Sequence, residues 1–290
     1  SEGYWVRGVD LKPPEYAETE EDDFMVLDLR SESNVVTCMH LNESWGKGFD
    51  EVYQLAADMG GAGYIFTGEH DADVMHNSAL INLHVAKTAA KFREKPRVFY
   101  SSSACIYPRH NQVDPDNPLC TEERLYKSFE RNYGLEVRIA RFHNIFGPEG
   151  SWNNGKEKAP AALCRKVAEV SPGGAIEVWG SGDQTRSFLY IDECLEAVRR
   201  LMESDCSEVV NIGSEEMVSI NELASMISTL ARKPILIDNI DGPEGVKGRN
   251  SDNTFLEEKL GWKPSTHLTD GLQKTYDWIE EQVKTKVTTL

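Results

Sequence analysis

Three serines and a cysteine directly follow a hydrophobic stretch, in the segment Ser101-Ser-Ser-Ala-Cys-Ile-Tyr-Pro108. In a doubly wound parallel sheet the carboxyl ends of the strands face the ligand crevice, so polar side chains placed there can meet a substrate. Ser103 could hydrogen-bond a substrate oxygen, and the thiol of Cys105 could exchange protons with it. A lone cysteine is more often a small buried hydrophobe, so the segment by itself leaves both interpretations open.

Three basic residues could act on an anionic substrate. Lys158 stands just before a predicted helix, and a lysine that is partly desolvated near a thiol can serve as its complementary acid. Arg186 and Arg249 lie in glycine-containing segments, and arginine suits bidentate binding of phosphate. In an acidic chain these two arginines are the candidates for a diphosphate clamp, although a lysine such as Lys158 is more commonly a solvated surface residue.

Two segments could bind a dinucleotide. Asp10 closes the first predicted strand, where an acid accepts hydrogen bonds from the adenosine ribose and repels a 2′-phosphate, so NAD is favoured over NADP. Taken alone, an ordinary strand-end aspartate is more common. The stretch Tyr53–Gly63 runs into a turn of small residues, which either lets a cofactor approach the backbone or serves only the fold.

Another polar cluster, Arg141-Phe-His-Asn144, ends a further predicted strand. Asn144 can donate to a phosphate or a sugar, whereas a histidine such as His143 is more often structural. The glycines between Gly242 and Gly248 match a cofactor loop by spacing alone. That stretch contains a proline and does not open a βαβ unit, so we do not interpret it as a cofactor loop.

Apolar strands that alternate with helices must position these residues. This alternation predicts an α/β fold with a Rossmann-type, doubly wound parallel sheet covered on both faces. The expected strands are 4–10, which we take as buried, 24–29, 52–57, 97–101 and 136–140, with helices over 73–92 and 122–133.

Beyond Gly147 the order of the predicted strands and helices changes, which predicts a smaller mixed α/β domain. A capping box, Ser219 with Glu222, opens a helix that reaches residue 231. We therefore divide the chain into 1–146 and 147–290, with about 186–205 returning to the first domain. The other expected elements are helices 160–170, 192–202, 253–260 and 269–283 and strands 175–179, 186–191, 209–213 and 234–240.

The net charge of −17 over 290 residues excludes two classes of partner. Such a surface repels nucleic acid and anionic lipid. The sequence shows no run that could span a bilayer and no signal peptide at Ser1. The six cysteines lack disulfide-like spacing, so we expect free thiols in a cytoplasmic protein, without a metal site.

Together these segments resemble the GDP-mannose 3,5-epimerase family of the extended short-chain dehydrogenases/reductases. The resemblance runs from Glu2 to about Lys284. Many sugar epimerases share the SSS and RxxNxxGP patterns, whereas the combination of ACIYP, EKAPAA and GRNSDN is much narrower. The matching segments are LAADMGGAG, SSSACIYP, RFHNIFGPEGSW, GKEKAPAA, GDQTRSFLYIDE, VNIGSEEMVS and GPEGVKGRNSDN.

The resemblance implies a redox-assisted epimerisation. Bound NAD oxidises the C4 hydroxyl of GDP-mannose, the ketone acidifies the hydrogens at C5 and C3, and the C4 position is reduced again at the end. By the match, Cys105 and Lys158 are the acid/base pair, and Ser103 positions the sugar together with Gly60. The family also implies a homodimer.

The resemblance assigns further binding residues. The first domain would bind NAD and the second would mainly bind the nucleotide sugar. The cofactor residues would be Asp10, Asp28, Leu29, Ala56 and Ala57, and the substrate residues would be Gly60, Ser103, Ala104, Cys105, Asn144, Glu157, Lys158, Ala159, Lys166, Gln184, Thr185, Arg186 and Arg249.

Two parts of the family pattern are missing from the printed sequence. The family's opening strand and glycine-rich turn would precede Ser1. Moreover, no tyrosine of this chain has a lysine four positions later, whereas the family uses a Tyr-x-x-x-Lys pair for C4 oxidation. The flanks match closely, which favours a shortened or spliced version of an active-type enzyme, or a printed sequence that omits residues of the protein. Only a protein that truly lacks both parts should bind NAD weakly and not oxidise C4.

Two alternatives stay open. A GDP-4-keto-6-deoxymannose epimerase/reductase shares the CIYP feature. That family, however, uses NADPH and a histidine as the partner of the cysteine, whereas this chain offers Lys158 as the partner, and Asp10 disfavours NADP. A catalytically inactive nucleotide-sugar-binding homologue would explain the missing Tyr-x-x-x-Lys pair. Retention of Cys105 together with Lys158 argues against a pure binder.

Overall fold

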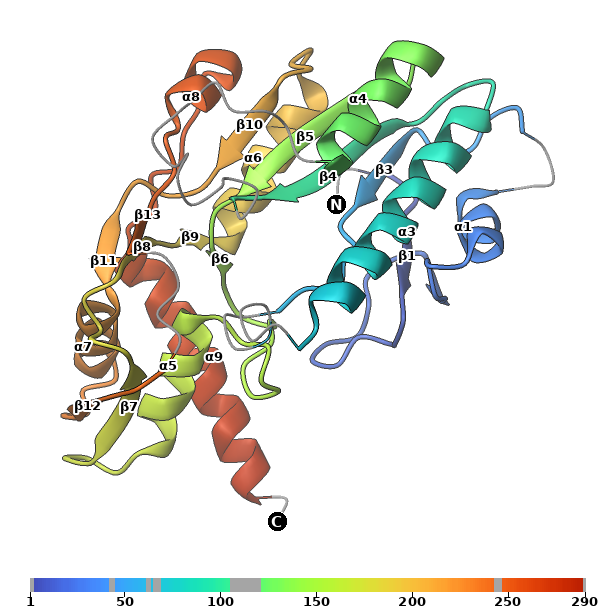
Figure 1. Cartoon of the computed structure of the whole chain (residues 1–290). Helices are drawn as coiled ribbons and strands as arrows, with labels where there is room; N and C mark the ends of the chain where they lie inside the picture. The colour runs from blue at the N-terminus through green and yellow to red at the C-terminus, as the bar shows by residue number, and fades with distance from the viewer. Residues whose placement is uncertain are drawn as a thin grey trace.

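The structure is a computed structural model, and it describes residues 3–41, 45–60, 64, 69–104, 121–242 and 247–288. It has the α/β architecture expected from the sequence, with parallel strands and helices on both faces (Figure 1).

The main sheet has the strand order β10-β5-β4-β3, with every neighbouring pair parallel. Its strands alternate along the chain with the helices α3 and α4. The bounds are β3 (Glu51–Gln54), α3 (Asp71–Lys91), β4 (Arg97–Ser103), α4 (Thr121–Tyr133), β5 (Val137–Phe142) and β10 (Val209–Ile212).

Strand β4 shows why the sheet is covered on both faces. Val98 and Tyr100 pack into a core with α3, whereas Phe99 between them packs into a second core with helix α6 (Ile191–Glu203). Successive side chains of a strand point to opposite faces, so a continuously apolar strand needs a cover on each side. Figure 1 shows α3 and α4 on the near face and α6 on the far face.

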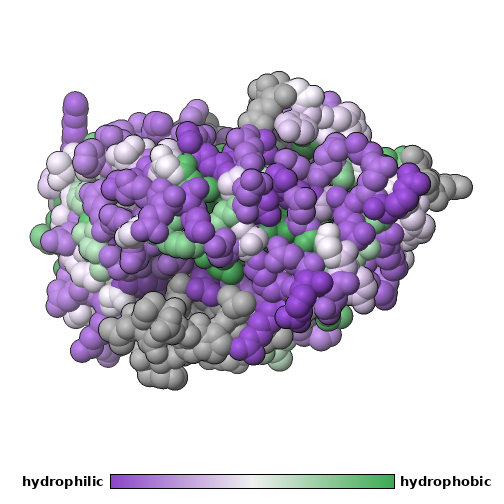
Figure 2. All heavy atoms as spheres, turned by 90° about the horizontal axis from the view of Figure 1, so that it is seen from above, coloured by the Kyte–Doolittle hydropathy of each residue, from purple (hydrophilic) through white to green (hydrophobic). Residues whose placement is uncertain are grey.

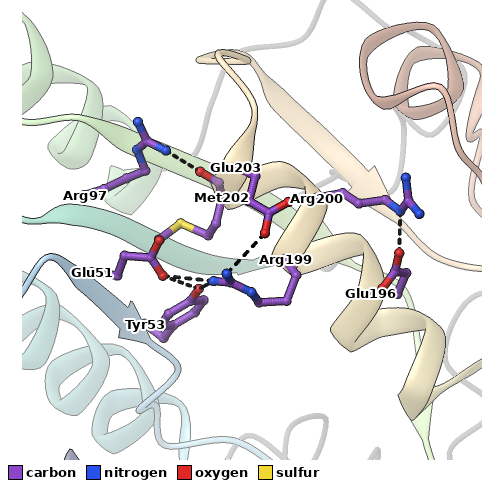
Figure 3. Close-up of polar contacts among 8 residues, drawn as sticks. All are labelled: Glu51, Tyr53, Arg97, Glu196, Arg199, Arg200, Met202 and Glu203. Atoms are coloured by element: carbon purple, nitrogen blue, oxygen red, sulfur yellow. Dashed lines mark hydrogen bonds and ion pairs between the residues drawn. The ribbon is translucent and has the colours of Figure 1, made fainter. Parts of the chain in front are cut away.

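Polar contacts fasten α6 to the sheet edge at β3 (Figure 3). Arg199 donates to Glu51 Oε2 at 2.9 Å and also bonds the hydroxyl of Tyr53, and an ion pair of 3.3 Å joins Arg199 to Glu203. Arg97 of β4 donates to the carbonyl oxygen of Met202 at 2.6 Å. These contacts fix the layer spacing far from the carboxyl ends of the strands.

The strands β1 (Arg7–Asp10) and β2 (Asp23–Val26) form a separate parallel pair, followed by helix α1 (Glu32–Met39). Within the described residues β1 pairs only with β2, and β3 pairs only with β4. Trp5 stacks on Phe49 with ring centroids 6.1 Å apart, so the two sheet edges lie near each other. In the order of a doubly wound sheet, one more strand lies between two such edges.

The expectation of a buried strand from Tyr4 was wrong. Tyr4, Trp5 and Val6 are 55%, 49% and 46% exposed, and the strand begins only at Arg7. A strand that is paired on one side alone cannot bury all of its side chains. Helix α1 was not expected at all. Its Val35, Cys38 and Met39 face the core at helical spacing.

The second half builds a separate core from helices and short sheets, seen at the lower left of Figure 1. Strand β7 pairs with β12, β8 pairs with β11 and β13, and β6 pairs with β9. The predicted capping box at Ser219 is present. The bounds are β6 (Ile145–Phe146), α5 (Ala159–Glu169), β7 (Ala175–Trp179), β8 (Thr185–Ser187), β9 (Leu189–Tyr190), β11 (Met217–Ser219), α7 (Ile220–Leu230), β12 (Leu236–Ile240), β13 (Gly248–Arg249), α8 (Thr254–Leu260) and α9 (Leu268–Thr288).

The expected strand 186–191 is two strands. β8 and β9 are separated by Phe188 and pair with different neighbours, so the chain passes from one small sheet to the other.

The division of the chain at residue 146 stays a prediction. Among the described residues no helix is long and apolar enough to cross a membrane. On the face shown in Figure 2, hydrophilic residues dominate.

Candidate functional site

The carboxyl ends of the parallel strands gather most of the predicted site residues. Strand β4 ends at Ser103, which is the register partner of Phe142 at the end of β5. Asp10 ends β1 and is exposed. Ser103 and Ala104 are partly and fully buried, respectively. Cys105 lies outside the described residues.

A buried network of charged and polar side chains holds the carboxyl ends of β4 and β5 to helix α4. Glu123 of α4 is fully buried and accepts from Ser102 Oγ at 2.6 Å and from Arg141 Nε and Nη2 at 2.9 and 2.8 Å. A buried carboxylate requires such partners. Glu123 was not predicted from the sequence. Arg141, near the end of a largely apolar strand, was the available signal, because a partly buried guanidinium needs acceptors and a carboxylate can supply them.

His143 follows β5 and is buried, with its backbone N–H donating to the carbonyl of Ile212 at 2.9 Å. Burial lowers the pKa of His143 to about 4, with hydrogen bonding to Asn211 opposing it and the charges of Arg249 and Arg141 lowering it further. The ring is therefore neutral near pH 7, which is consistent with a structural histidine.

We predict that His143 makes the protein less stable in mild acid. Its folded pKa of about 4 lies below the usual 6.5, so only the unfolded chain takes up this proton as the pH falls from 6.5 toward 4. The free energy of unfolding should drop by about 2 kcal/mol between about pH 8 and pH 5 from this group. Urea unfolding of the protein and of His143→Gln at both pH values checks this. The variant should lose much of that slope, and an equal slope would contradict the assignment.

Asn144 joins β5 to the small sheets. Its φ of +43° lies in the left-handed region, which asparagine tolerates better than most residues. Its amide donates to Ser187 O at 3.0 Å, and its own carbonyl accepts from Leu189 N at 3.1 Å. The side chain thus has one amide hydrogen engaged and lies beside β8.

Arg186 and Arg249 are brought together by strand pairing. They are register partners in the parallel pair β8–β13, although 62 residues lie between them. Register partners of neighbouring strands project to the same face, where two like charges repel each other. Two arginines on one face are suited to bind an anion such as a diphosphate.

The loop before α5 carries Lys158. Lys158 is exposed at the N-cap of α5, and its charge partly offsets the effect of burial, which raises the pKa of Cys194 in α6 to about 12. The loop turns at Gly155, whose φ is +81°. Glu157 accepts from Gly155 N at 2.6 Å and from Arg165 at 3.3 Å, so its carboxylate holds the loop. Ala159 is the first residue of α5.

Other predicted substrate residues already have protein contacts. Lys166 Nζ donates to Glu177 O at 2.7 Å, and burial lowers the pKa of Lys166. Gln184 donates to Trp179 O at 3.2 Å, while its buried Oε1 has no protein partner within the described residues. Thr185 begins β8, beside Arg186.

On the cofactor side, both carboxylate oxygens of Asp28 accept from the guanidinium of Arg30 at 2.7–3.0 Å, and this bonding lowers the pKa of Asp28. The turn after β3 is fixed by the buried Gln54, which bonds the backbone of Ala56 in both directions. Leu29 and Ala56 pack against the core, whereas Ala57 is exposed.

Comparison with known proteins identifies the family. Residues 1–213 match the "NAD dependent epimerase/dehydratase family". The chain is 45% identical over 306 residues to the GDP-mannose 3,5-epimerase of Arabidopsis thaliana, covering 98% of this chain and 78% of the relative. The chain belongs to the NAD dependent epimerase/dehydratase family. Members of this family are enzymes that use NAD.

Solved structures agree with this fold. A UDP-glucose 4-epimerase from Thermotoga maritima with UDP-glucose superimposes with a TM-score of 0.81 at 21% identity, over 97% of this chain and 92% of that chain. A UDP-glucuronic acid 4-epimerase from Bacillus cereus with UDP-glucuronic acid and NAD gives 0.77 at 22% identity, over 96% and 92%. The alignment with the Arabidopsis relative is longer than the 290 residues of this family member, so the relative has residues within the matched region that this chain lacks.

Proposed function

We propose that this family member epimerises GDP-mannose at C3 and C5 through a transient 4-keto intermediate. The pairing of Arg186 with Arg249 carries the proposal, because register partners of neighbouring strands project to one face and guanidinium groups suit the bidentate binding of a diphosphate. A diphosphate suits this site, and the Arabidopsis relative is named for a GDP-sugar.

The sugar would extend from the arginines toward the ends of β4 and β5. Asn144 lies beside β8 through its bond to Ser187, and Ser103 lies at the neighbouring strand end. We assign the remaining contacts to residues that follow β3 and β4, the loop before α5, α5 itself and the start of β8: Gly60, Ala104, Glu157, Ala159, Lys166, Gln184 and Thr185.

NAD would lie across the ends of β1, β2 and β3. The carboxylates of Asp10 and Asp28 suit the ribose hydroxyls, and the small side chains of Ala56 and Ala57 leave the turn after β3 open, with Leu29 beside Asp28. When bound, NAD would supply the hydride acceptor for oxidation at C4 of the sugar and the hydride donor for its reduction. An acid beside the ribose disfavours the additional phosphate of NADP.

Cys105 and Lys158 would move the protons. One group removes the proton at C5 or C3, which the neighbouring ketone acidifies, and the electron pair passes to the ketone oxygen as an enolate. The other group returns a proton from the opposite face of the ring. In the sequence, Cys105 follows the last residue of β4 by two positions, whereas Lys158 is the N-cap of α5, so the two groups belong to separate segments of the chain. We also expect a homodimer.

One observation favours a second candidate, a catalytically inactive nucleotide-sugar-binding homologue. No tyrosine in this chain has a lysine four positions later. Loss of that pair would remove the base for C4 oxidation and leave the anion site and the proton-transfer residues in place.

A substrate that is already oxidised separates proton transfer from oxidation. We predict that the protein exchanges the C3 and C5 hydrogens of GDP-4-keto-6-deoxymannose in deuterium oxide without NAD, as followed by NMR. Lys158→Met should slow this exchange about 100-fold, since general acid–base groups contribute on that order. The control Lys259→Met removes a lysine of an ion pair with Glu208 and should not change the rate. Exchange no faster than in buffer would contradict the assigned roles, and reduction of the ketone by NADPH would support an epimerase/reductase instead.

A further inference from the structure

An ion pair joins the loop that carries Lys158 to the turn that follows β3. Lys156 Nζ lies 3.6 Å from Asp58 Oδ1, and the same ammonium lies 4.0 Å from the centre of the Tyr64 ring. Tyr64 donates its hydroxyl hydrogen to Asp58 Oδ1 at 3.1 Å. We call these three residues the loop latch.

The latch is more than a surface ion pair. The side chain of Asp58 is 20% exposed and that of Lys156 is 40% exposed, so both are partly desolvated. Burial raises the pKa of Asp58, but hydrogen bonds from Asn77 and Tyr64 and the charge of Lys156 outweigh it and lower that pKa overall. A carboxylate with three such partners stays ionised at neutral pH and holds one orientation.

Gly60 makes room for the latch. A Cβ built at Gly60 would lie 2.7 Å from Cβ of Tyr64 and 2.8 Å from its ring. A larger residue at this position would therefore displace the aromatic ring that the Lys156 ammonium contacts. The close packing gives Gly60 a role in positioning the loop before α5.

The latch is anchored on the cofactor side of the molecule. Asn77 of α3 donates to Asp58 Oδ2 at 2.9 Å and accepts from Arg30 at 3.3 Å, and Arg30 holds Asp28. A continuous series of polar contacts thus runs from the end of β2 to Lys156. Helix α3 packs against β4 in a buried hydrophobic core, so it gives the latch a rigid base.

We propose that Asp58 is a positioning residue, which holds the Lys158 loop against the cofactor side through Lys156 and Tyr64. The inference rests on the proposed function for the role of Lys158, but the latch itself is a property of the protein without ligands. Lys158 is the N-cap of α5, and its carbonyl accepts the N–H of Ala162 at 3.0 Å, so release of the loop should loosen the first turns of this helix.

Hydrogen exchange measured by mass spectrometry tests the latch without any ligand. In Lys156→Met and Asp58→Asn, the amides that begin at Ala162 should exchange about three to ten times faster, as expected from loss of an ion pair and a cation–π contact. Lys156→Arg should restore protection, because it keeps the charge over the ring. The double variant should exchange no faster than the faster single variant, which a merely local loss of packing would not produce. Lys259→Met is the matched control.

Titration with GDP-mannose completes the test. The affinity of Lys156→Met should fall about three- to tenfold, and that of Lys156→Arg should stay near the starting value. Unchanged exchange around Ala162 in both single variants would overturn the latch. If the unaltered protein fails to bind GDP-mannose, the proposed function is wrong, and the exchange result still decides the latch by itself.

Discussion

Replacing Arg249 by methionine should weaken the binding of GDP-mannose about 10- to 100-fold, because a charge-assisted hydrogen bond contributes about 1.5–3 kcal/mol. Arg249 and Arg186 are register partners on one face of a small sheet. A diphosphate that bridges the two guanidinium groups would accept charge-assisted hydrogen bonds from both. Arg186→Met should therefore have an effect of similar size.

Isothermal titration calorimetry with GDP-mannose and with GDP checks this prediction. Both ligands should lose affinity together, since the effect falls on the diphosphate. Arg249→Lys should recover only part of the binding, because an ammonium lacks the planar fork of arginine. The matched control is Arg200→Met, which removes an exposed arginine paired with Glu196 on α6. Equal affinities for Arg249→Met and the unaltered protein would remove the main support for a nucleotide-sugar site.

Replacing Glu123 by alanine should lower the free energy of unfolding by about 3–5 kcal/mol, the usual result of removing one partner of a buried ion pair. Glu123 is fully buried and is the shared acceptor for Ser102 and Arg141. Its loss would leave the Arg141 guanidinium, whose side chain is 12% exposed, without its carboxylate.

Urea unfolding measures this change as a shift of the midpoint at constant slope. The urea midpoint of Glu123→Gln should lie between those of Glu123→Ala and the unaltered protein, since an amide still accepts a hydrogen bond but brings no charge. Glu208→Gln removes the acid of an exposed ion pair with Lys259 and should change the midpoint little. A midpoint of Glu123→Ala within error of the unaltered protein would show that the network does not hold the strand ends together.

Much of the fold could be predicted because its strands and helices are marked locally. The strand expected over 97–101 has an apolar centre, Val98-Phe99-Tyr100, and the structure buries this centre between two helical layers. The capping box at Ser219 predicted the start of α7 to the residue. By contrast, the split of 186–191 into β8 and β9 depends on pairing with strands far along the chain, which no local pattern reveals.

The candidate site was predictable by residue type but not by geometry. Arg186 and Arg249 could be chosen as phosphate ligands from their chemistry, yet their pairing requires the register of β13 against β8. Glu123 was missed because, in the sequence, it resembles the other charged residues of an amphipathic helix. The contacts of Asp58 with Lys156 were missed for the same reason, since each is an ordinary charged residue until the fold brings them together.

The most direct test of the account follows GDP-mannose with NAD in deuterium oxide by NMR. We predict that deuterium enters at C5 or C3 and that new epimers of the sugar form. Saturation-transfer signals that show bound GDP-mannose, without any deuterium entering the sugar, would contradict epimerisation and would identify the chain as a binding homologue of this family.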